Sequence, residues 1–259
     1  MENKKQYTTQ QIWIKIGHRL YPYFQEMTEN AKNLYNITNY YIRQVYTALH
    51  NKKGLHPLQQ EVLDILESNL RPINEMQRIA CEKRRARELK KPIEKQKEIK
   101  LTLFQSPTKE KSFLTFRFLD ALFKQIQQVD YRRLPIHSSQ AVMRMVQQNW
   151  MSFFRSLKEY KVNPGKYKGR PGIPRYERNN QKEVYFSNQE CSIQEGRYVK
   201  FPRTKTRLNI GKLGLSPGRF KQVRVLPRYQ QFLVDLSWKS MDLILWNVSL
   251  IESWALIWG

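Results

Sequence analysis

The residues best suited to chemistry in this chain are cations and tyrosines that alternate with glycines over residues 166–176. Lys and Arg bind phosphate oxygens, Tyr can stack on bases or riboses, and Gly lets the backbone approach a ligand closely. We expect nucleic-acid contacts from Lys166, Tyr167, Lys168, Arg170, Arg175 and Tyr176. The alternative for this segment is a solvated, disordered basic loop.

Positive charge extends well beyond this segment. Residues 161–230 carry 17 Lys and Arg against four Glu, and the whole chain has a formal charge of +24. A charge of that size destabilises a compact state unless a polyanion neutralises it. Because the basic residues are spread along the chain and not gathered beside a hydrophobic anchor, nucleic acid is favoured over a membrane surface. Further phosphate contacts are expected at Arg203, Lys205, Arg207, Lys221, Arg224 and Arg228.

The sequence contains no recognisable catalytic or metal-binding set. The four histidines share no metal-ligand spacing, the few aspartates form no converging set, and no glycine-rich loop fits a phosphate cradle. Ser138 follows His137, but a helix cap explains this serine better than a nucleophile. Cys81 and Cys191 form no CxxC pair, so we expect two core residues and neither a zinc ribbon nor a disulfide scaffold. The residues alone predict a binding protein without catalytic, metal or cofactor sites.

Helical spacing of apolar residues dominates the chain up to residue 160, after a short alternating strand at 11–16. The predicted helices span 24–49, 57–70, 79–101, 112–128 and 138–160. Pro92 should kink or end the third helix, and Ser138 and Ser139 should cap the last. The basic residues of 83–100 suit an exposed helix face as well as nucleic-acid binding, and the tyrosines of the first helix suit packing better than base stacking.

After residue 161, glycines and prolines become frequent and short β-type runs follow. These runs are 183–186, 192–193, 198–201, 207–210, 222–226 and 231–236. Their regular spacing by turns is typical of a small antiparallel barrel or sandwich, which could take back the strand at 11–16. The predicted fold class is therefore α+β, a small antiparallel β-barrel interrupted by helices.

Six segments then point to a family. They are KNLYNITNYYIRQ (32–44), QNWMSFFRSLKEY (148–160), GKYKGRPGIPRY (165–176), VYFSNQ (184–189), VKFP (199–202) and KQVRVLPR (221–228). In this order they resemble the amino-terminal half of TnpB (OrfB-type) proteins, which are transposon-encoded RNA-guided DNA endonucleases. The resemblance covers roughly residues 10–238.

The resemblance implies a wedge domain, an oligonucleotide-binding-like β-barrel formed by residues 1–20 and 161–238. A helical recognition lobe at 21–160 would interrupt it. In that family these modules hold a guide RNA and read a short motif on target DNA. The family's RuvC-like nuclease, with three metal-binding acids and a four-cysteine zinc ribbon, has no counterpart here. Magnesium and zinc are therefore expected only in the missing nuclease half.

The last residues, 239–259, differ from the rest of the chain. They carry one Lys, no Arg and three of the six Trp. Read in a shifted codon frame, Leu250–Gly259 permits Asn-Arg-Ile-Met-Gly-Ile-Asp-Leu-Gly, which resembles the start of that nuclease domain. We therefore expect an out-of-frame tail that begins near Trp238–Met241. The alternative is a genuine hydrophobic helix, although its acidic and polar residues disfavour a membrane span.

Together these inferences predict a truncated TnpB-like protein that binds structured guide RNA and double-stranded target DNA without cleaving it. No membrane and no small-molecule substrate are expected. Since the N-terminus lacks an apolar signal region, we expect a cytoplasmic protein that associates with the nucleoid when it is bound to DNA. Two alternatives stay open. One is an active endonuclease whose nuclease half is restored by frameshifting or supplied in trans, and the other is a decayed, poorly folded transposon product.

Overall fold

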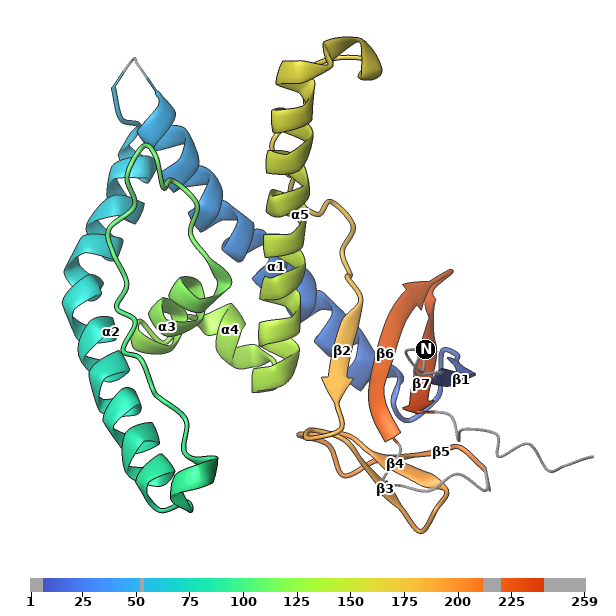
Figure 1. Ribbon diagram of the computed structural model, residues 1–259. Helices are drawn as coiled ribbons and strands as arrows, with labels where there is room; N and C mark the ends of the chain where they lie inside the picture. The colour runs from blue at the N-terminus through green and yellow to red at the C-terminus, as the bar shows by residue number, and fades with distance from the viewer. Residues whose placement is uncertain (1–6, 52–53, 212–219, 240–259) are drawn as a thin grey trace, which may run out of the picture. The chain divides into compact units, whose positions relative to one another are not determined.

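The computed structural model describes residues 7–51, 54–211 and 220–239 (Figure 1). The chain divides into two compact units, a helical unit of residues 22–185 and a β unit of residues 1–21 and 186–259. Residues 161–185, which the sequence pattern assigns to the β-module, group with the helical unit. The residues after Lys239, where the aberrant tail is expected, lie outside the described part of the chain.

The helical unit begins with two long helices. α1 (Tyr21–His50) buries the apolar stripe that the pattern at 24–49 predicts, including Phe24 and Leu34. α2 (Pro57–Leu89) begins at a reciprocal cap, in which the His56 ring accepts from the N–H of Leu58 and the Gln59 side chain accepts from the N–H of His56. The Gln59 side chain also donates to Thr47 Oγ1 over 2.9 Å, which joins α2 to α1.

α2 is one continuous helix, so the prediction of two separate helices at 57–70 and 79–101 is wrong. Pro72 lies inside it, although proline lacks the N–H that a helix interior uses. The buried side chains of Ile73 and Cys81 continue the packed face beyond this proline, which explains why tertiary packing overrides the break. The helix ends at Leu89, shortly before Pro92, which confirms that this proline would stop it.

An irregular segment then runs back along α2 (Figure 1). Asn74 of α2 holds it by two hydrogen bonds to the backbone of Phe104, one from Phe104 N–H (2.7 Å) and one to Phe104 C=O (2.9 Å). The short 3₁₀ helix η1 (Ile93–Lys95) lies at the start of this segment. It leads to α3 (Phe116–Gln125), α4 (Val129–Arg133) and α5 (Ile136–Val162).

The predicted cap of the last helix is wrong. α5 begins at Ile136 after Pro135, so Ser138 and Ser139 lie inside its first turn and are buried. Ser139 Oγ donates to the carbonyl of Tyr131 (2.8 Å) and to that of Pro135 (3.1 Å). The serine therefore ties the start of α5 to α4, because its hydroxyl donates to the Tyr131 carbonyl.

Among its described residues, the β unit contains seven strands in two antiparallel sheets, the strand β1 near the N-terminus and six later ones. β2 is shared with the helical unit, since only its second half, from Phe186, belongs to the β unit. Their bounds are β1 (Tyr7–Ile14), β2 (Val184–Ser187), β3 (Ser192–Gln194), β4 (Tyr198–Lys200), β5 (Arg207–Asn209), β6 (Phe220–Arg228) and β7 (Gln231–Lys239). The predicted β runs after residue 161 are confirmed within one or two residues, except that β6 and β7 are longer. The first strand was predicted at 11–16 but lies earlier, at Tyr7–Ile14.

The strand β1 is separated from its partner by most of the chain. It pairs with β7, from Tyr7 opposite Lys239 to Ile14 opposite Phe232. The return of this strand to the β-module is therefore confirmed. The pairing places the alternating residues of β1 on a sheet whose buried face contains Val234 and Leu236.

The predicted closed barrel is not found among the described strands. They form an open four-stranded sheet in the order β1-β7-β6-β2 and a three-stranded sheet in the order β3-β4-β5. The rings of Phe186 in β2 and of Phe201, the residue after β4, are both buried and lie 5.6 Å apart. Cys191 is buried in this unit and Cys81 in the helical unit, as expected for small core residues.

Within the described ranges, no helix has both the length and the apolar character needed to cross a membrane.

Candidate nucleic-acid interface

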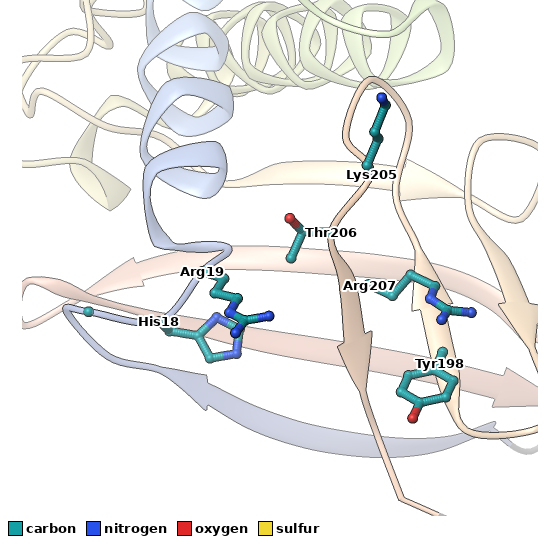
Figure 2. Close-up of a pocket in the computed structure, with 7 residues that line it drawn as sticks. His18, Arg19, Tyr198, Lys205, Thr206 and Arg207 are labelled. Atoms are coloured by element: carbon teal, nitrogen blue, oxygen red, sulfur yellow. The ribbon is translucent and has the colours of Figure 1, made fainter.

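A basic pocket lies in the β unit, where the turn after β1 faces the β4–β5 hairpin (Figure 2). Its volume is about 660 Å³. The lining residues are Gly17, His18, Arg19, Tyr198, Lys205, Thr206 and Arg207. Three of these are permanently charged cations and none is a carboxylate, a composition that suits phosphate oxygens.

The turn after β1 positions His18 and Arg19. Gly17 has φ of +91°, a conformation that costs a glycine nothing and strains other residues. The N–H of His18 donates to the carbonyl of Lys15 over 3.1 Å, which closes the turn. The His18 ring accepts the N–H of Leu20 at Nδ1 over 3.1 Å, so the neutral ring carries its proton on Nε2. Because Leu20 is fully buried, this turn is anchored to the core.

The hairpin positions Arg207. Tyr198 pairs with Asn209, so Arg207 lies diagonally across from Tyr198 on the same face of the sheet. The Arg207 guanidinium carbon lies 4.6 Å from the centre of the Tyr198 ring, and that of Arg197 lies 4.8 Å away. Arg207 also donates through Nη1 to the Glu195 carboxylate over 2.9 Å. The ring contact and the ion pair together restrict the guanidinium to one region of the pocket wall.

A second pocket adjoins the first and shares Lys205 with it. It has a volume of about 560 Å³ and is lined by residues 188–192 and 200–205. Lys200 and Arg203 add positive charge, and Glu190 adds one carboxylate. Arg203 has φ of +59°, which is uncommon for a residue other than glycine. The structure thus brings three cations predicted from the sequence, at 203, 205 and 207, to two neighbouring pockets.

The other three predicted cations of the β unit lie on β6, and none of them lines these two pockets. Lys221 is exposed at a bulge in β6. Arg224 is half-buried and lies opposite Asp235 of β7, whose carboxylate also accepts from Gln11 of β1 over 2.9 Å. Arg228 is exposed at the end of the strand. Because Asp235 lies opposite it, Arg224 belongs to a row of polar side chains that crosses the strands. The position of this arginine can therefore be explained without nucleic acid.

In the helical unit, three of the segments that carry the resemblance meet around Asn39. This side chain is fully buried. Its Nδ2 donates to the carbonyls of Pro174 (3.2 Å) and Arg175 (3.1 Å), and its Oδ1 accepts from Trp150 Nε1 (2.8 Å). One amide therefore joins α1, α5 and the basic segment that follows α5.

Two further residues of α1 hold the same segment. Asn36 forms two hydrogen bonds with the backbone of Glu177, of 2.8 and 3.0 Å. Arg43 donates through Nη1 to the Pro174 carbonyl over 2.6 Å, and its guanidinium carbon lies 4.9 Å from the centre of the Tyr176 ring. Since residues three and four apart share one helix face, these side chains form a single row along α1. The reading of this segment as a disordered loop is not supported for residues 174–177.

The predicted contact residues of 166–176 have different environments. Lys166 forms an ion pair with Glu159 of α5, and the Tyr167 hydroxyl donates to the same carboxylate over 2.8 Å. The hydrogen bonds from Lys166 and Tyr167 lower the pKa of Glu159. Tyr176 is partly exposed next to Arg43. Lys168, Arg170 and Arg175 are exposed.

The basic residues of 83–100 stay exposed along the end of α2 and the segment after it. Some of their charge is offset locally, since Lys91 pairs with Glu88 at 2.6 Å and Lys100 with Glu98 at 3.6 Å. These contacts fit a solvated helix face as well as they fit a binding surface.

Sequence reasoning missed His18, Arg19, Tyr198 and Thr206 as pocket residues. The signal for the first two was a Gly-His-Arg sequence directly after an alternating strand, which marks a turn that presents polar side chains. Nothing in the sequence indicated that this turn would lie against a hairpin about 180 residues further along the chain, because that contact is long-range and includes a hydrogen bond of 3.2 Å from Gln10 of β1 to the Ile210 carbonyl after β5.

No group of three or more His, Cys, Asp or Glu residues suited to a metal ion occurs in the part of the chain that the structure describes. A scan against protein-family models gives no match to this sequence, and a search of curated proteins finds no similar one.

Proposed function

We propose that this chain is a TnpB-like nucleic-acid-binding protein that holds structured RNA, with duplex DNA as a second ligand, and does not cleave either. The observation that carries the proposal is the pocket whose lining contains Arg19, Lys205 and Arg207 and no carboxylate. Cations grouped in this way are stabilised by phosphates, which bind guanidinium and ammonium groups through charge-assisted hydrogen bonds. The formal charge of +24 supports the same class of partner.

Two further features support the TnpB-like part of the proposal. The first strand returns to the later β-module across a helical insertion, which is the arrangement that the resemblance implies. The segments at 32–44, 148–160 and 165–176, chosen for the resemblance, contact one another at Asn39, Trp150 and Pro174. Because the three segments pack against one another, a common structural role explains why they occur in the same chain.

The test is to express the chain, purify it, and sequence any RNA that remains bound. We expect enriched structured transcripts and affinity that falls steeply with salt. Changing Lys205 to Ala should weaken binding to all sequences similarly and reduce the salt slope by about one, as loss of one phosphate contact predicts. Lys109→Ala, which removes the same charge from an exposed position in the helical unit, is the matched control.

Two outcomes would overturn the proposal. A preparation free of RNA that shows no preference for polyphosphates over neutral polymers would exclude nucleic-acid binding. Cleavage of plasmid DNA by this chain on its own would exclude a purely binding role.

A further inference from the structure

One face of the four-stranded sheet exposes aromatic side chains. Alternation along β1 places Tyr7, Thr9, Gln11 and Trp13 on this face, and all four are exposed, whereas Ile14 on the other face is buried. Trp13 keeps 48% of its surface exposed. About 20 Å of strand separates the two aromatic positions, since a strand rises about 3.4 Å per residue. This face of β1 is therefore open to solvent from one end to the other.

Trp13 differs from the tryptophans that the fold buries. Trp150 is fully buried and donates its indole N–H to Asn39, and the buried ring of Trp238 lies 5.7 Å from that of Phe220. The side chain of Trp13 forms no ring contact and no hydrogen bond with any residue that the structure describes. Its ring is therefore available to a ligand.

Cross-strand pairing sets an apolar row next to Trp13. This residue lies opposite Leu233 of β7, which lies opposite Leu226 of β6. Paired residues share a face of the sheet, with Cβ atoms about 4.5–5.5 Å apart. Leu226 is buried and Leu233 is half-buried, so Trp13 at the edge of the sheet is the member of the row that is most exposed.

Most charged residues on the same face are cations. Because β6 and β7 alternate as β1 does, Arg224, Arg228 and Lys239 lie on this face. The one acid of β1, β6 and β7 is Asp235, which lies opposite Arg224. Arg228 lies opposite the uncharged Gln231. The face thus keeps a net positive charge beside its exposed rings.

From this arrangement we propose that the face of β1, β7 and β6 that carries Trp13 binds an unpaired segment of RNA, with one base stacked on the indole ring. The inference rests on the proposed function and adds the class of nucleotide that this face takes. An accessible aromatic ring flanked by cations suits a single strand, because every base has a flat face and every phosphate carries a negative charge. The bases of a duplex are stacked on one another, so a duplex offers Trp13 no free base.

The experiment measures the affinity of the whole chain for three RNA ligands of about 12 nucleotides, a length within the range that one β-module of this size covers. They are a single strand, an abasic strand with the same number of phosphates, and a duplex of the same sequence. Trp13→Ala should weaken binding of the single strand about 5- to 150-fold, which corresponds to the 1–3 kcal/mol of one stacked base. Binding of the abasic strand and of the duplex should stay within about twofold, since neither presents a base to the ring.

Two further variants separate stacking from folding. Trp13→Leu keeps an apolar side chain next to Leu233 but removes the aromatic face, so it should lose affinity for the single strand as Trp13→Ala does. Trp13→Phe keeps an aromatic ring and should retain most of the affinity. Ile16→Ala, which removes an exposed apolar side chain just beyond β1, is the control and should leave all three affinities unchanged. Thermal unfolding checks that each variant is folded.

The outcomes distinguish the two proposals. If no RNA binds the wild-type chain at low salt, the proposed function fails and this inference fails with it. If the wild-type chain binds the abasic strand as tightly as the single strand, nucleic-acid binding stands and stacking on Trp13 is refuted. Equal losses for all three ligands in Trp13→Ala would also refute it. An altered oligomeric state of Trp13→Ala with unchanged RNA affinity would instead make this face a protein interface.

Discussion

Replacing Asn39 by Ala is the sharpest test of how the helical unit holds its basic segment. The amide is fully buried and joins Trp150 Nε1 to the carbonyls of Pro174 and Arg175. In the variant, the Pro174 carbonyl keeps its hydrogen bond from Arg43, of 2.6 Å. The buried indole N–H of Trp150 and the Arg175 carbonyl lose their partners from this side chain.

The size of the effect follows from these two groups. An orphaned buried donor such as the Trp150 N–H costs about 1–3 kcal/mol, and the lost bond to Arg175 costs about 0.5–1.5 kcal/mol. Alanine returns roughly 0.6 kcal/mol through its higher helix propensity. We therefore expect the free energy of unfolding of the helical unit to fall by about 1–4 kcal/mol.

The assay is amide hydrogen exchange followed in peptides from α1 and α5, since this reports the opening free energy of the helical unit alone. Limited trypsin digestion provides a second readout. Loss of the Asn39 anchor should make the chain after the exposed cations Lys168 and Arg175 more accessible to cleavage.

Asn33→Ala on the same helix is the matched control. It carries the same gain in helix propensity and loses only a 3.4 Å contact with Lys32. Trp150→Phe removes the partner donor. The double variant Asn39→Ala/Trp150→Phe should therefore lose less stability than the sum of the losses in the two single variants, with a coupling energy of about 0.5–3 kcal/mol. Equal stability of the two asparagine variants, or strictly additive effects of Asn39→Ala and Trp150→Phe, would refute this account of the unit.

Three other predictions concern the β hairpin, pH and salt. Tyr229 and Gln230 form the β6–β7 turn with φ of 48° and 57°, so replacing them by Asn and Gly should stabilise the β unit by about 1–2 kcal/mol in thermal unfolding. An unchanged or lowered stability would argue against left-handed strain in this turn. Burial raises the pKa of Glu177, but hydrogen bonds from Lys182 and from backbone N–H groups outweigh it and lower the pKa overall. The stability from this carboxylate should therefore be present above about pH 4.3 and be lost as pH falls through its lower folded value. Glu177→Gln should flatten the acid side of the stability profile, and an identical profile would contradict this. If six to ten phosphates are neutralised, RNA affinity should fall about 10³–10⁵-fold between 50 and 200 mM salt, whereas a flat response would exclude phosphate-dominated binding.

Local patterns predicted most of the elements, because helix and strand periodicities are written in consecutive residues. The stripe of α1 and the β runs after residue 183 follow from the spacing of apolar side chains, whereas the return of β1 to the later strands was expected only as a possibility. Errors arose where a local signal competed with packing. Pro72 does not break α2, since buried Ile73 and Cys81 continue its packed face, and Ser139 bonds to carbonyls of the preceding turn because its hydroxyl is enclosed there.

The sequence by itself determined the excess of positive charge, the alternation of strands with turns and the grouping of cations with tyrosines, since each depends on composition or on near neighbours. Only the tertiary structure decided which cations act together. Arg19 is distant in the chain from Lys205 and Arg207, and its turn reaches the hairpin where β1 contacts the segment after β5, with a hydrogen bond from Gln10 to the Ile210 carbonyl. Arg224 was predicted as a phosphate contact on the same grounds, yet it lies opposite Asp235, an acid of the neighbouring strand. The physical reason is that charge is a property of each residue, whereas a binding site is a property of distances that long-range pairing sets.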